Sequence, residues 1–165
     1  MRTRALHDFC NWLERTPASL AIQNTEWVVP AVQTFHILAI AAVMSSVLMI
    51  DLRVLGIVGR DQPLQRIAKR FLPIIWWTLP LLLASGIVMI IGEPARALEN
   101  SIFQLKMGLV VAAIAVTLGL QIPLGRYTGY WDLSGSRRAA LKFIAIVSLL
   151  IWVGIVFAGR WIAYF

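Results

Sequence analysis

Charged residues are scarce in this sequence: Asp, Glu, Lys and Arg make up 14% of its 165 residues, against about a quarter in an ordinary soluble domain. The single cysteine rules out an internal disulfide and a cysteine-rich metal site. With two histidines and no phosphate-binding glycine loop, the chain also lacks the motifs of common soluble enzymes. These absences exclude a disulfide scaffold, a disordered chain and an ordinary cytosolic enzyme.

Acidic residues are also few, so 15 basic against 8 acidic residues give a net charge of +7 and a pI near 10.5. Such a balance can indicate nucleic-acid binding. Long apolar runs separate the basic residues here, however, so that no basic stripe forms. Nucleic acid is therefore not an expected partner.

Apolar residues make up 59% of the chain, and the mean hydropathy is +0.78. Four runs are each about 20 residues or slightly longer, which suits a helix that crosses a bilayer and is too long for a strand. The bilayer offers no water to unpaired backbone groups, so spanning segments must be helical. We expect an all-α membrane protein, a four-transmembrane-helix bundle forming one integral domain over 1–165. The expected spans are 27–50, 71–91, 102–122 and 141–161.

Charges, glycines and prolines mark the expected ends of these runs. Residues 51–53 (Asp-Leu-Arg) should end the first and 92–94 (Gly-Glu-Pro) the second. Pro123 and Gly125 should end the third, and Pro80 should kink the second. We expect the carboxylate and guanidinium within 51–53 to pair locally or with charges of the following loop.

Residues 1–26 are too polar to span a bilayer, and they lack the apolar core of a signal peptide. Several apolar side chains share one face of a helix in this segment. Thr16 followed by Pro17 predicts an N-cap and a first-turn proline, which begin a second short helix. We expect an N-terminal amphipathic helix lying at the membrane interface. The residues of its apolar face are Leu6, Phe9, Cys10 and Leu13.

Basic charge is unevenly divided between the two sides of the expected bundle. The positive-inside rule places the loops after the first and third runs in the cytoplasm, because 9 of the 15 basic residues lie there. Both termini then face outward, with Trp27 and Trp161 at the outer boundary. The basic residues on the cytoplasmic side are Arg53, Arg60, Arg66, Lys69, Arg70, Arg126, Arg137, Arg138 and Lys142.

His36 is the most informative polar residue within the runs, since ionisable groups in a bilayer are costly and usually functional. Gln33 lies three residues earlier and so on the same helical face. An imidazole here can ligate haem iron or another metal, or relay a proton. The alternative role is a hydrogen bond from His36 to a neighbouring helix, to which Gln33 on the same face could contribute.

Lys106 and Arg160 lie on the same outer side as His36 in this topology. Lys106 either reaches the lipid headgroups with its amine or, losing its charge when buried, acts as a second ligand opposite His36. Arg160 is either an interfacial anchor or a partner for a carboxylate such as a haem propionate. Met44 and Met107 are soft ligands in principle, and core packing is their expected role.

Four segments carry a resemblance to known families. FHILA at 35–39 and IDLRVLG at 50–56 look like an uncharacterised family of small bacterial four-helix membrane proteins. LERTP at 13–17 and FQLK at 103–106 also fit that family, and the resemblance covers nearly the whole chain. It implies a multi-pass protein of the bacterial inner membrane, and the charge distribution then puts both termini in the periplasm.

A more distant resemblance is to the small membrane protoporphyrinogen oxidase family. That family has a histidine in its first helix and a lysine in its third, both associated with haem b, and these fall on His36 and Lys106. The aromatic and glycine usual after the histidine are replaced by 43–46 (Val-Met-Ser-Ser), and its arginine- and histidine-containing segment by 51–53. The resemblance therefore implies a haem site, and it does not extend to the oxidase activity.

We expect a haem b-binding electron-transfer protein or cytochrome-like subunit, with metal ligands His36 and Lys106 and with Gln33 and Arg160 beside the cofactor. Quinone, a larger membrane complex or a second copy of the chain are the expected partners besides the lipid bilayer. The alternative is a cofactor-free accessory subunit of a membrane complex. A stand-alone enzyme would need more acid–base groups than the runs supply, and a transporter would need paired broken helices.

Overall fold

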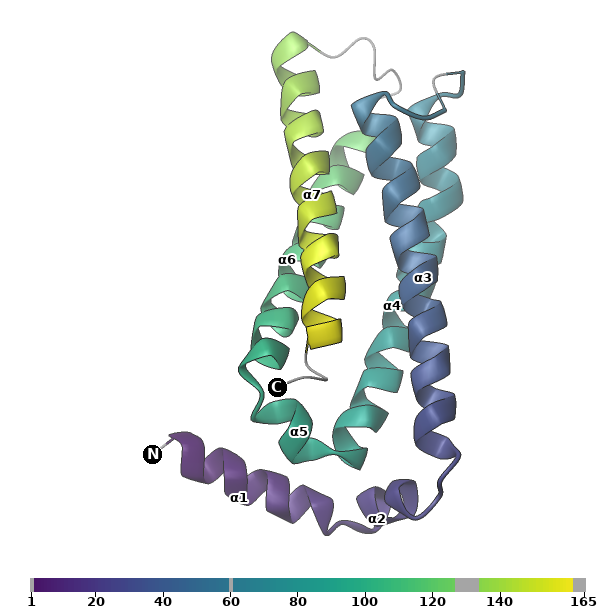
Figure 1. The fold of residues 1–165 in the computed structure, drawn as a ribbon. Coiled ribbons are helices and arrows are strands. Elements are labelled where there is room, and N and C mark those ends of the chain that lie inside the picture. Colours follow the sequence, from purple (N-terminus) through teal and green to yellow (C-terminus); the bar gives the residue numbers. More distant parts are fainter. Residues whose placement is uncertain (1, 60, 127–133, 162–165) are drawn as a thin grey trace.

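A computed structural model describes residues 2–59, 61–126 and 134–161, and within these ranges it contains seven helices and no strand. Figure 1 shows four long helices standing side by side, with two short helices laid across one end. The helices are α1 (Arg2–Glu14), α2 (Pro17–Gln23), α3 (Val28–Leu55), α4 (Leu64–Gly92), α5 (Pro94–Leu98), α6 (Ser101–Arg126) and α7 (Gly135–Trp161).

The all-helical prediction is confirmed, and α3, α4, α6 and α7 are each long and apolar enough to cross a membrane. The expected end of α4 is also confirmed, because the helix stops at Gly92. A short helix that the sequence did not predict, α5, then begins with Pro94 in its first turn.

The C-terminal ends of α3 and α6 differ from those expected. The charged residues of 51–53 do not stop α3, which continues to Leu55 and ends where Gly56 adopts a left-handed φ of 79°. The Gly56 N–H and the Ile57 N–H then bond back to the carbonyls of Arg53 and Leu52, which closes the last turn. Charge raises the cost of a side chain in lipid, but it does not break the backbone hydrogen bonds of a helix.

Prolines are likewise tolerated inside the long helices. α6 runs through Pro123 and Gly125 to Arg126, so the prediction that these residues end it was wrong. α4 contains both Pro73 and Pro80 and still continues to its C-terminus. A spanning helix can absorb the lost backbone bond when neighbouring groups satisfy the freed carbonyl.

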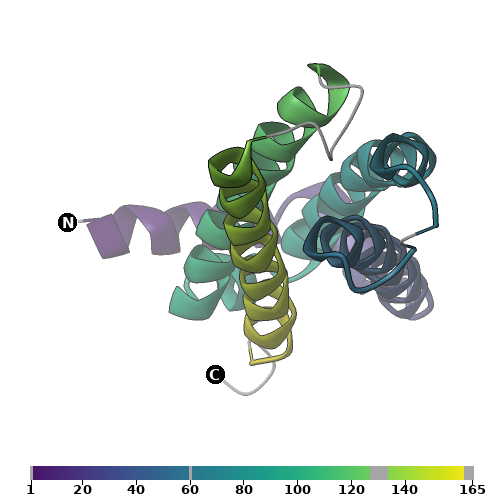
Figure 2. The same ribbon diagram turned by 90° about the horizontal axis from the view of Figure 1, so that it is seen from above.

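The four long helices form two pairs. α3 packs along α4, α6 packs along α7, and α7 joins the pairs by lying against α3. The view from above in Figure 2 shows the α3–α4 pair beside the crossed α6–α7 pair. α4 and α6 are separated in the chain only by the short α5 but have little contact, so the two pairs meet chiefly through α3 and α7.

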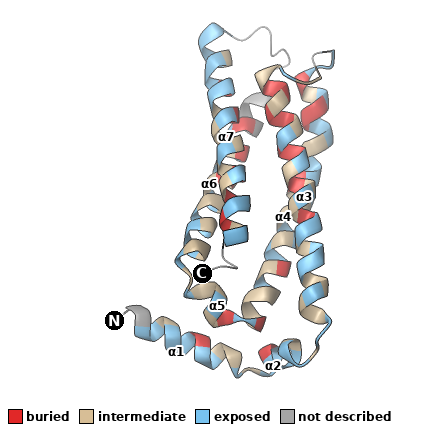
Figure 3. Ribbon diagram, viewed as in Figure 1, coloured by how far each residue is buried: buried red, intermediate tan, exposed pale blue. Residues whose placement is uncertain are grey.

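The packed core occupies one half of the bundle, the half nearest the turn between α3 and α4, as the buried positions in Figure 3 show. In the other half, next to α1 and α2, only Ala39, Ser85, Gly92 and Ala158 of the long helices are buried. The buried side chains of the core are Val43, Val47, Ile50, Val54, Leu64, Ile67, Ala68, Ile75, Ala113, Leu120, Leu141, Ala145, Trp152 and Ile155.

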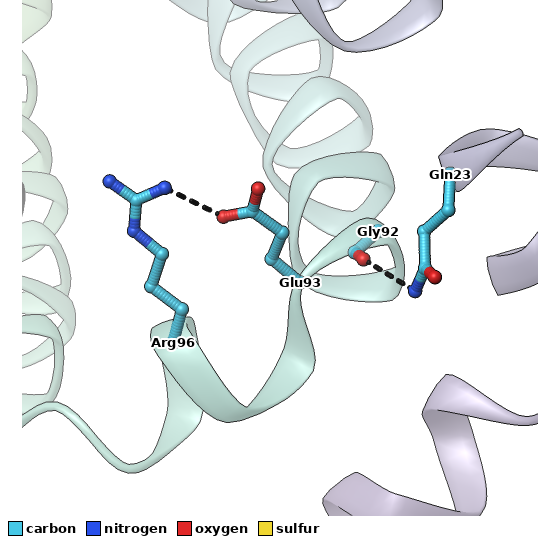
Figure 4. Close-up of polar contacts among 4 residues, drawn as sticks. All are labelled: Gln23, Gly92, Glu93 and Arg96. Carbon is cyan, nitrogen blue, oxygen red and sulfur yellow. Dashed lines mark hydrogen bonds and ion pairs between the residues drawn. The ribbon is translucent and has the colours of Figure 1, made fainter. Parts of the chain in front are cut away.

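The short helix α2 is fixed to the end of α4 by polar contacts. The predicted Thr16 cap is confirmed, since its side chain accepts a hydrogen bond from the Ser19 N–H. The Ser19 hydroxyl donates to the Ile91 carbonyl at 2.7 Å. The Gln23 amide donates to the Gly92 carbonyl at 3.0 Å, and Figure 4 shows this bond reaching across to the last turn of α4.

The same junction contains a close approach and an exposed ion pair. A Cβ added at Gly92 would lie 3.1 Å from Cγ2 of Ile22, so α2 contacts α4 where the side chain is absent. Arg96 at the start of α5 pairs with Glu93 at 2.9 Å, on the far side of the same turn in Figure 4. Two neighbouring elements thus hold the C-terminal end of α4.

Helix α1 lies along α5. Nδ1 of His7 is 2.9 Å from a carboxylate oxygen of Glu99. Cys10, also on α1, is fully buried. Phe9 and Trp12 are 48% and 63% exposed, so part of the apolar surface of α1 faces away from the protein. The interfacial position of α1 stays a prediction, which this exposed aromatic pair supports.

Candidate functional site

The four predicted site residues come from three helices in the half of the bundle outside the core. His36 and Gln33 lie on α3, Lys106 lies on α6, and Arg160 ends α7. His36 and Lys106 are half-buried, whereas Gln33 and Arg160 are exposed. The residues thus divide into an inner pair and two surface positions.

His36 is held by a serine on the neighbouring helix. Its Nδ1 lies 2.7 Å from Oγ of Ser85, in α4. Ser85 is 7% exposed, one of the few buried side chains of this half. On the next residue, a Cβ added at Gly86 would lie 3.9 Å from Cε1 of His36, so the imidazole packs over the Ser85–Gly86 step.

The direction of this hydrogen bond follows from the other contacts of Ser85. Its hydroxyl donates to the Leu81 carbonyl at 2.7 Å, and a hydroxyl has only one hydrogen to give. We therefore assign the proton of the shared bond to Nδ1 of His36, which donates to the Ser85 oxygen. Nε2 of His36 then carries a lone pair, and no described residue hydrogen-bonds to it.

Lys106 turns inward toward α7. Its Cε and Nζ both lie 3.7 Å from the position that a Cβ on Gly159 would occupy. Within the described part of the chain, no carboxylate pairs with this amine. Lys106 and His36 thus lie in the same half of the bundle, on helices that do not contact each other, and their pairing stays a prediction.

The remaining candidates are further from this pair. The alternative role of His36, a hydrogen bond to a neighbouring helix, is present in the structure as the bond to Ser85 of α4, and the exposed Gln33 takes no part in it. Arg160 is exposed beside Trp161 at the end of α7, as an interfacial anchor would be. Met44 packs against the core as expected, whereas Met107 is 40% exposed and faces away from it.

Ser85 is the functional candidate that the sequence analysis missed. It is 49 residues from His36 in the chain and sits in an apolar run where a serine can simply bond its own helix. Within such a run, Ser85 is a small polar residue followed directly by a glycine, Gly86. This pair of residues was the sequence signal that could have pointed to a helix contact here.

At the opposite end of α3, Asp51 and Arg53 are both 1% exposed. The Arg53 guanidinium donates to the Gln62 carbonyl of the following turn, at 3.1 and 2.7 Å. Asp51 instead hydrogen-bonds the Ser148 hydroxyl of α7. The expectation that the Asp51 carboxylate pairs locally or with loop charges was therefore wrong.

Taken together, these observations describe a protein with four helices able to cross a membrane, and with a half-buried histidine and a half-buried lysine on two of them. The model of a family of unknown function, DUF6644, matches residues 12–165. The chain belongs to that family, in agreement with the resemblance to an uncharacterised family. No curated protein and no solved structure matches the chain.

Proposed function

We propose that this chain is a membrane-embedded haem b-binding electron-transfer protein in which Nε2 of His36 is an axial ligand of the iron. The supporting observation is the bond from Nδ1 of His36 to Ser85. A histidine that ligates a metal through one nitrogen characteristically donates the proton of the other to a fixed acceptor. His36 has this arrangement, because its Nδ1 bonds Ser85 and its Nε2, the proposed ligand atom, faces away from the serine.

Lys106 is the proposed second ligand, or a close neighbour of the haem. A buried amine loses its charge more readily than an exposed one, and the neutral form has a lone pair for a metal. Among the described residues there is no group of three or more His, Cys, Asp or Glu side chains that could hold a metal ion. A porphyrin, which supplies four ligands itself, matches a site with one histidine and one amine.

The lack of packing around the pair supports a cofactor-sized ligand. Along 101–112 of α6 no residue is buried, and along 28–42 of α3 the only buried one is Ala39. Glycines face the two ligands, Gly86 beside His36 and Gly159 beside Lys106. Each leaves room where a larger side chain would contact the ligand residue. A haem b bound here would supply one-electron transfer.

The surroundings fit exchange of electrons within a bilayer. The four long helices support insertion into the bacterial inner membrane, and the charge of the loops supports periplasmic termini. The His36 half then lies toward the periplasm, with Arg160 near enough to that surface to pair with a haem propionate. A quinone or a partner subunit in the membrane is the proposed source or acceptor of the electrons.

The test compares His36→Ala with His7→Ala, which changes the only other histidine, exposed on α1. Each variant is expressed with ample haem, purified in mild detergent, and its oxidised and dithionite-reduced absorption spectra are recorded. We expect a Soret band and a reduced α-band in the wild type and in His7→Ala, and neither band in His36→Ala. A His36→Ala variant that inserts normally and keeps the wild-type spectrum contradicts the proposal.

A cofactor-free accessory subunit is the second candidate, and one observation favours it. Small residues of α6 face outward, with no atom within 4 Å of a Cβ built at Gly108 or Gly119. Ala115 between them is exposed. Such a surface allows close approach of another helix, from a partner or a second copy. A colourless protein that co-purifies with a partner, even with ample haem, supports this candidate over the haem proposal.

A further inference from the structure

The end of the bundle farthest from α1 and α2 carries basic side chains on two helices. α4 and α7 both begin at this end, as Figure 1 shows. Four of these basic residues are exposed and the fifth is partly buried. We call them the basic end of the bundle: Arg66, Lys69 and Arg70 of α4, and Arg138 and Lys142 of α7.

The two groups of basic residues lie at the same level of the bundle. Ala68 of α4 and Leu141 of α7 belong to one cluster of buried residues. Lys69 and Lys142 directly follow these two residues in the sequence, and both are exposed. The cluster therefore places basic residues of α4 and of α7 around the same layer of the core.

Within each helix, the basic residues repel one another. Arg66 and Arg70 are four residues apart, as are Arg138 and Lys142, and like charges at this spacing destabilise a helix. Positive charge in the first turns of a helix also opposes the helix dipole. Neither α4 nor α7 contains an Asp or Glu, so neither helix supplies a counter-charge of its own.

The described carboxylates at this end do not supply the counter-charge either. Asp51 is 1% exposed inside the bundle, and Asp61 is exposed in the turn before α4. Among the residues that the structure describes, no carboxylate forms an ion pair with any residue of the basic end. The Arg70 guanidinium lies 5.7 Å from the centre of the Phe71 ring, a contact that leaves its charge in place.

Exposed apolar side chains continue from each group toward the middle of the bundle. Ile74 and Trp77 follow Arg70 along α4. Ile146 and Leu150 of α7 follow Lys142 at intervals of four residues, and so lie on its face of the helix. Positive charge at the end and an apolar surface beyond it match the phosphate and the acyl chains of a phospholipid. A soluble anion would leave the apolar part uncovered.

We propose that the basic end binds the headgroups of anionic phospholipids, with their acyl chains along the exposed apolar residues of α4 and α7. Clusters of Lys and Arg beside membrane-spanning helices attract anionic lipids in this way. The lipid phosphates provide the negative charge that both helices lack, and their binding stabilises the first turns of α4 and α7. The proposal concerns the end opposite His36 and does not depend on the haem proposal.

The test measures thermal unfolding of the purified full chain in dodecyl maltoside while phosphatidylglycerol is added. We expect a saturable rise in Tm that shrinks at high NaCl concentration, because salt screens exposed charges. Phosphatidylcholine should give a much smaller rise, and so should inorganic phosphate, which has no acyl chains. Lys69→Gln with Arg70→Gln, and separately Arg138→Gln with Lys142→Gln, should raise the phosphatidylglycerol concentration at half-saturation several-fold.

The matched control is Arg4→Gln with Arg15→Gln, which removes two positive charges from exposed positions at the opposite end. This variant should retain the wild-type half-saturation. The proposal is overturned if phosphatidylcholine or inorganic phosphate raises Tm as much as phosphatidylglycerol does. It is also overturned if either pair of substitutions at the basic end leaves the half-saturation unchanged, or if the control weakens binding as much as they do.

Discussion

At the scale of single residues, the two histidines of the chain lie in contrasting environments. His7 is exposed on α1 and paired with a carboxylate, whereas His36 is half-buried between helices and bonded to a neutral hydroxyl. The first arrangement favours a protonated ring that holds charge, and the second favours a neutral ring with a free lone pair. Position alone therefore makes one histidine a structural ion-pair partner and the other a candidate ligand.

If Ser85 positions the His36 ring, its removal should weaken haem retention without abolishing it. Loss of the group that orients a ligating histidine typically costs about 10-fold to 100-fold in metal affinity. We expect Ser85→Ala to lower haem affinity by about that factor and to broaden the reduced α-band. Ser46→Ala is the matched control, since Ser46 is buried and bonds the Ala42 carbonyl of its own helix but no histidine. Equal haem affinity in both variants would contradict a positioning role.

The His7–Glu99 pair should make the docking of α1 depend on pH. The hydrogen bond that His7 donates to Glu99, together with the charge of Glu99, raises the pKa of His7 above the ordinary 6.5. The stabilisation is therefore complete below about pH 6.5 and is lost as the pH rises through the higher pKa of the folded state. Buried Cys10, the only cysteine in the chain, reports on the docking through its rate of alkylation.

The protection of Cys10 is measured as the alkylation rate of the unfolded chain divided by that of the folded chain. We expect this ratio to fall as the pH is raised through the His7 pKa. The unfolded reference removes the pH dependence of the thiolate itself. His7→Gln keeps a polar side chain but cannot titrate, so its protection should stay level over the same range. A parallel fall in both proteins would show that the pair does not control docking.

At the scale of elements, the junction of α2 with α4 depends on a missing side chain. A methyl group at Gly92 would lie 3.1 Å from Cγ2 of Ile22, so the Ile22 side chain would have to move by a few tenths of an ångström. We expect Gly92→Ala to lower the free energy of unfolding by about 1 kcal/mol, measured by thermal unfolding in detergent. Adding Ile22→Ala should recover part of the loss, because it removes the opposing methyl.

Gly108→Ala is the control for this substitution. It also adds one methyl to a glycine of a long helix, but nothing lies within 4 Å of the new atom. Alanine is the better helix former, so the isolated protein should be unchanged or slightly more stable. A loss of stability at Gly108 equal to that at Gly92 would mean that the close approach to Ile22 is not the cause.

The limits of sequence reasoning are visible at this same scale. Apolar runs predicted all four long helices, because helix length and hydropathy are local properties of the chain. The partners of buried polar groups were not predicted, since they come from other helices: Ser85 for His36 and Ser148 for Asp51. Sequence patterns thus located His36 and Lys106 as candidates, but the bond that fixes the tautomer of His36 needed tertiary structure.

At the scale of the whole molecule, the two halves of the bundle differ in packing. The core half holds the buried aliphatic residues, while the other half holds few buried residues and contains both His36 and Lys106. Whether the His36 end of the bundle faces the periplasm depends on the orientation of the chain. That orientation rests on the positive-inside rule and therefore needs its own measurement.

Single cysteines in a Cys10→Ser background can determine this orientation. Glu26→Cys lies between α2 and α3 at the His36 end, and Asp61→Cys lies in the turn after α3, both at exposed positions. If nine of the 15 basic residues hold their loops in the cytoplasm, a membrane-impermeant maleimide added to spheroplasts should label Glu26→Cys alone. Asp61→Cys should become reactive only after lysis. The reverse pattern would place the His36 end, and the haem proposed there, on the cytoplasmic side.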